Sequence, residues 1–117
     1  RRFGAADAYL KPAMTRQILT VFTDAQAKKV VFEGKRSVAV ELRHKGRDRV
    51  LRANREIILS GGAINSPQLL QLSGIGDRDI LENLGIRGLH ELPGVGKNLQ
   101  EHVDACVLAP SVSLVVQ

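Results

Sequence analysis

Hydrophobic and polar residues alternate in the first half of the chain. Within residues 37–43 every second side chain is a branched apolar one, and this period of two indicates a half-buried β-strand. Other stretches rich in β-branched and aromatic residues also predict strands, at 17–22, 28–33 and 49–53. Gly34 and Gly46 stand in the turns that would join consecutive strands. The pattern therefore predicts an antiparallel β-meander.

Residues 57–59 differ from this pattern because they are three consecutive apolar residues, Ile-Ile-Leu. Successive side chains of a strand point to opposite faces, so such a run would be buried on both of them. This is typical of a strand in a parallel sheet. The expected fold class is therefore α/β, or an α+β part of such a fold, in which an antiparallel meander accompanies a buried parallel-type strand and two short helices.

The first of these helices is predicted directly after the apolar run. Gly61 and Gly62 permit a tight turn. Asn65 or Ser66 could cap the first amide groups of the helix, and Pro67 suits its first position. The side chains expected to pack on the sheet are Leu69, Leu70 and Leu72.

The second short helix is predicted within residues 77–85. Asp79 and Glu82 have the spacing of a capping box, and Gly85 would end the helix. Its apolar face would consist of Ile80, Leu81 and Leu84.

The segments on either side of this pattern are less regular. Near the N-terminus a short helical turn is expected to end at about Leu10, because Pro12 interrupts it. Residues 91–102 form a loop rich in proline and glycine that is long for a simple connection. Such loops commonly lie over a ligand.

The composition is that of one globular domain, with 117 residues of which 44% are hydrophobic and 25% charged. Both ends resemble cuts in a longer protein, because the chain begins at Arg1 without a methionine and ends within an apolar run. Cys106 is the only cysteine, which excludes an internal disulfide and is compatible with a reducing compartment, so we expect a cytoplasmic location. No apolar span of about 18 residues predicts a transmembrane helix.

The net charge of +5 comes largely from cationic residues clustered at 43–55. A cationic stripe of this kind either keeps a surface hydrated or contacts a polyanion. Aromatic residues make up only 3% of the chain, so a platform for stacking bases is poorly supplied. A stand-alone basic α+β module that binds nucleic acid or another polyanion is an alternative function.

Residues 60–76, SGGAINSPQLLQLSGIG, combine a strand end, a glycine turn and a helix start. The first amide groups of a helix lack internal partners, so such a corner either holds a phosphate or serves packing alone.

The dinucleotide fingerprint Gly-x-Gly-x-x-Gly and the nucleoside-triphosphate loop are both absent. His44, His90 and His102 lack the spacing of a helical metal pair. Spacing alone identifies no catalytic base.

The same stretch resembles the second signature of the glucose-methanol-choline (GMC) oxidoreductases, which are flavoproteins. The signature has Ser/Thr-Pro, two aliphatic residues and Ser-Gly-aliphatic-Gly, and here these are residues 66–67, 69–70 and 73–76. The segments FEGKRSVAVE, REIILS and LPGVGKNLQEH follow the family's order, so the resemblance covers nearly the whole chain. Within the family the sequence is similar to the choline dehydrogenase branch.

The resemblance implies an FAD-binding, Rossmann-like domain. Residues 1–92 would be the central part of this domain, and residues 93–117 would be a loop over the flavin and the start of a substrate-binding domain. The glycine fingerprint for the FAD pyrophosphate would lie upstream and the catalytic histidine downstream, so no catalytic residue is assigned within the chain. The parent enzyme would oxidise an alcohol by hydride transfer to the flavin, whereas these residues alone would be inactive. Uncovered strand edges would favour a homo-oligomer.

The resemblance also implies which residues approach the adenosine half of FAD. At Ala27, where the family usually has valine, main-chain groups would bond to the adenine. Ser60, Gly61 and Gly62 would lie near the adenosine and the diphosphate, because glycine lets the main chain come close to a ligand.

On the flavin side, the resemblance points to the sequence Asn-Leu-Gln-Glu-His at 98–102. Asn98 and His102 match the family's Asn-Leu-x-Asp-His, while Glu101 replaces the usual aspartate. Ile18 stands where asparagine is common. The expected cofactor contacts are thus divided between two separate parts of the chain.

Overall fold

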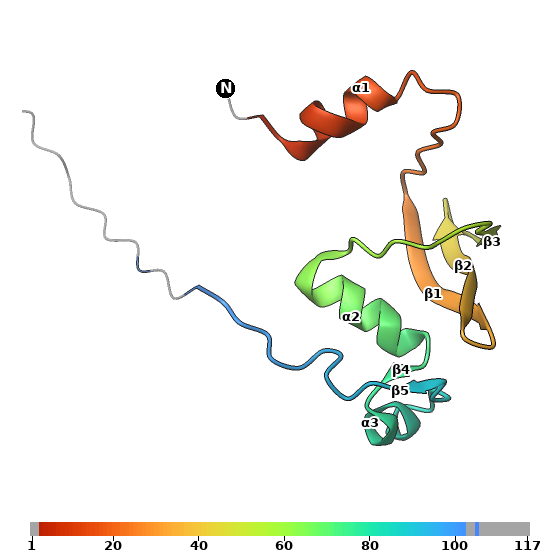
Figure 1. Cartoon of the computed structure of the whole chain (residues 1–117), viewed down its shortest axis with the longest axis vertical. Helices are drawn as coiled ribbons and strands as arrows, with labels where there is room; N and C mark the ends of the chain where they lie inside the picture. Colours follow the sequence, from red (N-terminus) through yellow and green to blue (C-terminus); the bar gives the residue numbers. More distant parts are fainter. Residues whose placement is uncertain (1–2, 103–104, 106–117) are drawn as a thin grey trace, which may run out of the picture.

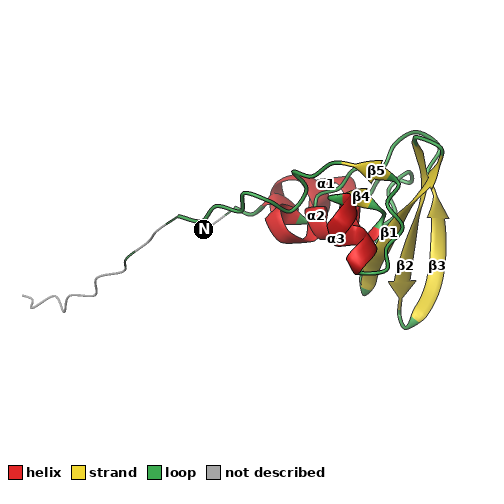
Figure 2. Cartoon of the chain, turned by 90° about the horizontal axis from the view of Figure 1, so that it is seen from below, coloured by secondary structure: helices red, strands yellow, loops and turns green. Residues whose placement is uncertain are grey.

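The structure is a computed structural model and describes residues 3–102 and residue 105. The interpretation of Cys106 lies outside the described residues. Within them the chain forms a mixed α/β arrangement (Figure 1), and the predicted fold class is confirmed. Figure 2 shows helices α2 (Gly62–Leu72) and α3 (Arg78–Asn83) beside the three-stranded sheet.

The three-stranded sheet is antiparallel with the order β1-β2-β3, as the predicted meander requires. Its strands are β1 (Ala25–Glu33), β2 (Arg36–His44) and β3 (Arg47–Arg52). Val30 pairs with Val40, which in turn pairs with Leu51, so these three side chains share one face of the sheet. An irregularity between Ala27 and Lys29 shifts the register of β1.

One of the predicted strands is wrong. Residues 17–22 form turns and irregular chain instead, and Ile18 is 94% exposed. β-branched composition describes side chains that suit a pleated, half-buried surface, and here the segment has no neighbouring strand to provide that surface. The meander therefore starts at Ala25, after a residue with a left-handed backbone at Asp24.

Residues 57–59 are also not a strand in this structure. They run as extended, unpaired chain beside the sheet, and the Ile58 side chain is 76% exposed. A strand buried on both faces needs neighbours that supply hydrogen bonds and apolar cover, and the described residues provide neither. The parallel pair lies elsewhere, between β4 (Ile75–Gly76) and β5 (His90–Glu91).

Helix α2 (Gly62–Leu72) packs against β1, as Figure 1 shows. It begins earlier than predicted, so Pro67 lies inside the helix and neither Asn65 nor Ser66 caps its first amide groups. Ser66 has a different partner, because its Oγ accepts a hydrogen bond from the Gly61 N–H at 2.9 Å. Leu69 and Leu70 are half-buried as expected, whereas Leu72 is 46% exposed.

Helix α3 (Arg78–Asn83) confirms the second predicted helix but not its cap. The N-cap is Asp77, whose carboxylate accepts a hydrogen bond from the Ile80 N–H, and not Asp79. Of the predicted apolar face only Leu81 is buried, while Ile80 and Leu84 are largely exposed. Gly85 ends the helix as predicted, and the Ile86 N–H donates to the Leu81 carbonyl in a Schellman arrangement.

The N-terminal helical segment does not end at Leu10. A π-helical turn, η1 (Ala6–Leu10), continues into the short helix α1 (Lys11–Ala13). Pro12 lies in the first turn of α1, where a missing N–H costs no intrahelical hydrogen bond. In Figure 1 this segment lies apart from the sheet and α2.

The apolar core is small. The buried apolar residues of the described chain are Val30, Ala39, Leu42 and Leu81. Many large apolar side chains remain exposed, including Ile58, Ile64 and Leu99. No helix among the described residues is both long and apolar enough to cross a membrane.

Candidate functional site

A hollow of about 500 Å³ lies between β1, the extended chain before α2, and α2 itself. Ala25 to Ala27 come from the start of β1, and residues 57–61 form another wall. Leu69 and Leu72 of α2 close the side that faces the sheet. The start of β1 and the later, continuous segment formed by residues 57–61 and α2 therefore meet at one cavity.

This hollow brings together three of the residues assigned to the adenosine half of FAD. Ala27, Ser60 and Gly61 all line it. Their side chains are small or absent, so the main chain forms much of the surface offered to a ligand. β1 is also an edge strand, which leaves half of its main-chain N–H and C=O groups pointing away from β2. The cavity has the room and the polar backbone that a heterocyclic base requires.

The turn before α2 is open toward solvent. Gly62 has φ +83°, and a Cβ placed there would meet no atom within 4 Å. The N-cap residue Gly61 has no side chain with which to cap α2. The Gly61 N–H donates to the Ser66 Oγ, whereas the next amide groups of this 11-residue helix have no recorded side-chain partner. The helix dipole adds positive potential at the same place. Gly62 does not line the hollow but stands at its rim, next to Gly61.

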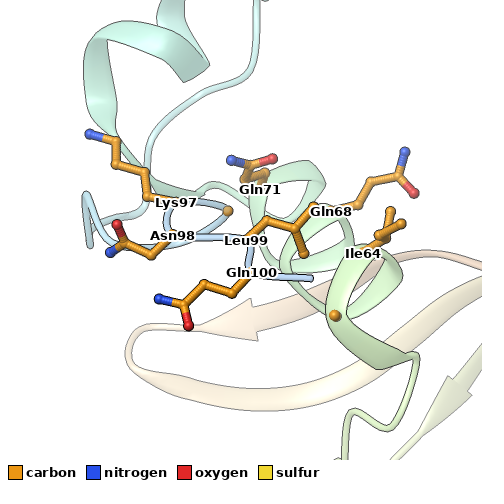
Figure 3. Close-up of a pocket in the computed structure, with 9 residues that line it drawn as sticks. Ile64, Gln68, Gln71, Lys97, Asn98, Leu99 and Gln100 are labelled. Carbon is orange, nitrogen blue, oxygen red and sulfur yellow. The ribbon is translucent and has the colours of Figure 1, made fainter. Parts of the chain in front are cut away.

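A second hollow of about 490 Å³ lies on α2 nearer its middle (Figure 3). Its walls are Ala63, Ile64, Gln68 and Gln71 of α2 and residues 96–100 of the following loop. Asn98, assigned to the flavin side, is among them. Helix α2 thus separates two cavities, one on the predicted adenosine side and one on the predicted flavin side.

The remaining predicted cofactor residue, His102, lies outside both hollows. It is exposed, and its recorded hydrogen bond is a main-chain one, from its N–H to the Glu101 carboxylate at 3.0 Å. His44 instead packs edge-to-face on Phe22, with ring centroids 5.3 Å apart. The described residues contain no cluster of histidine, cysteine and carboxylate side chains that could hold a metal ion.

Several residues of the cationic segment 43–55 take part in ion pairs within the chain. Asp48 contacts Lys28 at 2.9 Å and Arg43 at 3.2 Å, and Arg52 lies 3.7 Å from Glu33. The hydrogen bond from Lys28 lowers the pKa of the Asp48 carboxyl below its ordinary value, with further lowering from Arg43. Part of the positive charge is therefore balanced locally, which does not favour the polyanion-binding alternative.

Two side chains that join α2 to distant parts of the chain, Ser73 and Gln71, were not predicted from the sequence. Ser73 is buried at the end of α2, and its Oγ accepts a hydrogen bond from the Val30 N–H at 2.8 Å. Gln71 contacts the loop that forms the second hollow. The available signal was the position of both residues within the signature stretch, with Ser73 directly before Gly74-Ile75-Gly76 and Gln71 two residues earlier.

Comparison with known proteins places the chain among flavoenzymes. A family model described as GMC oxidoreductase matches residues 1–104. An uncharacterized GMC-type oxidoreductase of Mycobacterium tuberculosis (strain ATCC 25618 / H37Rv) is 53% identical over 102 residues, covering 87% of this chain and 19% of that protein. Mitochondrial choline dehydrogenase of Homo sapiens is 51% identical over 104 residues, covering 89% of this chain and 18% of that protein.

Solved structures give the same result. Pyridoxine 4-oxidase from Mesorbium loti matches with a TM-score of 0.75 and 35% identity, covering 80% of this chain and 18% of that one. An FAD-dependent oxidoreductase from Chaetomium thermophilum matches with a TM-score of 0.68 and 31% identity, over 72% of this chain and 15% of that one. The chain therefore spans about a fifth of the length of the curated relatives it matches. These matches support FAD as the cofactor, in agreement with the resemblance.

Proposed function

The chain belongs to the GMC oxidoreductase family, and on that premise we propose that it supplies one wall of the FAD site in a flavoprotein that oxidises an alcohol. The donor would be a primary alcohol, in line with the name of the human relative, choline dehydrogenase. The chain itself would contribute binding and orientation, while other parts of the protein contribute the catalytic base. The 117 residues alone would then be inactive.

The observation that carries this proposal is the hollow beside the start of α2. Two of its small residues, Ala27 of β1 and Ser60 of the chain before α2, come from separate segments and leave the cavity open. Packing alone does not require this, because bulkier side chains would fill the space and stabilise the fold by burying apolar surface. A ligand that contacts the main chain explains why the space is kept.

The residues of the chain would divide the work of holding FAD. Main-chain groups of β1 at Ala27 would orient the adenine. The uncapped amide groups at the start of α2 would attract the negative charge of the diphosphate. Asn98, across α2, would lie toward the flavin. The bound flavin supplies the hydride acceptor, and the protein fixes its orientation toward the alcohol.

The test is to fill the hollow by substitution in the natural-length protein. Ala27→Leu would place a branched side chain in the adenosine cavity, and overpacking of this kind costs about 1–3 kcal/mol, or about 5- to 150-fold in FAD affinity. The matched control is Ala5→Leu, the same change at an exposed position in the N-terminal segment. FAD titration followed by flavin fluorescence measures both variants.

The expected result is weakened FAD binding for Ala27→Leu and unchanged binding for Ala5→Leu. Equal affinity in the two variants would show that the hollow does not hold the cofactor. A natural-length protein that is colourless and does not bind FAD would refute the proposed function itself.

A further inference from the structure

We infer that Gln71 is a positioning residue that sets the place of residues 95–99 on the flavin side of α2, with the Asp77–Lys97 ion pair as a second tether. The inference rests on the proposed function, because Asn98 matters only if this segment faces a cofactor. It concerns the residues that hold the segment and not the cofactor contacts themselves.

The first tether is a hydrogen bond between distant parts of the chain. Gln71, on the last turn of α2, donates from Nε2 to the Val95 carbonyl at 3.2 Å, and the contact is partly buried. The next residue, Gly96, comes so close to the amide that an added Cβ would lie 2.8 Å from Nε2. The loop therefore approaches Gln71 most closely at a residue without a side chain.

The second tether acts two residues further along. Lys97 Nζ lies 2.9 Å from Asp77 Oδ2, and Oδ1 of the same carboxylate accepts from the Ile80 N–H as the N-cap of α3. Because the cap fixes the Asp77 side chain, Lys97 is held by a group that is already ordered. Lys97 also lowers the pKa of the Asp77 carboxyl, chiefly through this hydrogen bond, so the carboxylate stays ionised and the pair persists at neutral pH.

Both tethers attach residues that lie just before Asn98, namely Val95 and Lys97. Turn hydrogen bonds from the Val95 and Lys97 N–H groups, to Leu92 and Gly94, fold the loop locally but do not attach it to α2 or α3. Across the described residues, the recorded side-chain hydrogen bonds between segment 95–99 and the remaining chain are those of Gln71 and Asp77. The segment thus depends on these side chains for its place beside the hollow.

Asn98 itself has φ +58°, a left-handed conformation that asparagine tolerates better than most residues. Figure 3 shows Gln71 and Asn98 among the side chains around one hollow, on its helix and loop walls respectively. Loss of the Gln71 tether is therefore expected to displace Asn98 along with the loop.

The experiment compares Gln71→Ala with Gln68→Ala in the natural-length protein. Gln68 stands on the same helix and lines the same hollow, but its side chain makes no recorded hydrogen bond in the described structure, so it is the matched control for the exchange measurement. Gln71→Glu keeps the size and replaces the amide donor by a carboxylate oxygen facing the Val95 carbonyl. Hydrogen exchange of the peptide spanning 94–100 is measured without FAD, and the visible absorption and circular dichroism of the flavin are measured with FAD bound.

We expect Gln71→Ala and Gln71→Glu to speed exchange in this peptide by about 2- to 10-fold, the range of one side-chain hydrogen bond, and to change the flavin spectrum. Gln68→Ala should leave the exchange of this peptide unchanged, because the Gln68 side chain makes no recorded hydrogen bond to segment 95–99. Unaltered exchange in both Gln71 variants would overturn the tether. Faster exchange with an unaltered flavin spectrum would overturn the positioning role.

The two proposals fail separately. Absence of FAD binding in the unsubstituted protein removes the proposed function and with it the role of Gln71 toward the cofactor, whereas exchange still decides whether Gln71 holds the loop. A protein that binds FAD normally but shows no difference between Gln71→Ala and Gln68→Ala rejects only the inference about Gln71.

Discussion

The two ends of α2 use the same residue types in opposite ways. At the C-terminal end, Ser73 is 5% exposed, accepts a hydrogen bond from the Val30 N–H and donates one to the Leu69 carbonyl at 2.5 Å. A Cβ added at the neighbouring Gly74 would lie 2.5 Å from the Arg87 carbonyl oxygen. At the N-terminal end, Ser60 is exposed and an added Cβ at Gly62 would meet nothing within 4 Å.

The contrast separates two reasons for small residues within one signature stretch. The Ser73–Gly74 end is closed, because its small residues let three segments of chain meet without a gap. The other end is open at Ser60 and Gly62, which border space that no described segment occupies, whereas an added Cβ at Gly61 would lie 3.0 Å from the Asn65 Cβ. On the proposed function, the stretch would therefore both build the domain and offer a ligand surface, with the two roles at opposite ends of one helix.

The sharpest test of this contrast is the pair Gly74→Ala and Gly62→Ala. The two glycines have nearly equal φ, +86° and +83°, so the backbone strain of a Cβ, about 1–2 kcal/mol, is common to both. Only Gly74→Ala adds the overlap with Arg87, and we expect its total loss of unfolding free energy to exceed about 3 kcal/mol. Chemical denaturation of the natural-length holoprotein measures the difference.

Equal destabilisation by the two substitutions would contradict the distinction between a closed and an open end of α2, because backbone strain alone would then account for both. A Gly62→Ala variant of nearly normal stability that binds FAD less tightly would support the distinction, since the added methyl group would then obstruct the surface proposed to contact FAD.

A smaller effect is expected from the two serines. Ser73→Ala leaves the buried Val30 N–H without its partner, which costs about 1–3 kcal/mol of unfolding free energy. Ser60→Ala removes an exposed hydroxyl with no recorded hydrogen bond, so its cost should stay within about 0.5 kcal/mol. Thermal unfolding of both variants tests this, and a Ser60→Ala variant as unstable as Ser73→Ala would contradict an open N-terminal end.

The sequence was sufficient where local chemistry decides the structure. The period-two pattern at 37–43 predicted β2, because alternation specifies a strand with one buried face. Gly85 was correctly predicted to end α3, because a left-handed residue there closes the helix by short-range hydrogen bonds.

Prediction failed where a partner distant in sequence decides. Residues 57–59 have the composition of a buried strand, but strand pairing is not a property of three residues, and here they remain unpaired. Asp79 has the capping-box spacing, yet Asp77 is the cap, since β4 sets where the turn into α3 begins. The contacts of Gln71 and Ser73 were likewise invisible, because they join residues 24 and 43 positions apart.

The smallest expected effect is the change in stability with pH that comes from Asp77. It tests whether α3, the helix that follows the closed end of α2, is also ordered by specific contacts. The hydrogen bond from Lys97 lowers the pKa of Asp77 below its ordinary value of 3.8, and the Ile80 N–H lowers it further. A carboxyl with a depressed folded-state pKa stabilises the fold at pH values above 3.8, and this contribution disappears as the pH falls through the folded-state pKa.

Asp77→Asn keeps a capping oxygen but cannot ionise. We therefore expect the unsubstituted protein to exceed Asp77→Asn in stability at neutral pH and the gap to close in acid, with Lys97→Gln narrowing the gap at neutral pH. An NMR titration that finds the Asp77 carboxyl at or above 3.8, or a stability gap that does not change between neutral and acid pH, would remove the Asp77–Lys97 pair from the set of contacts that order this region.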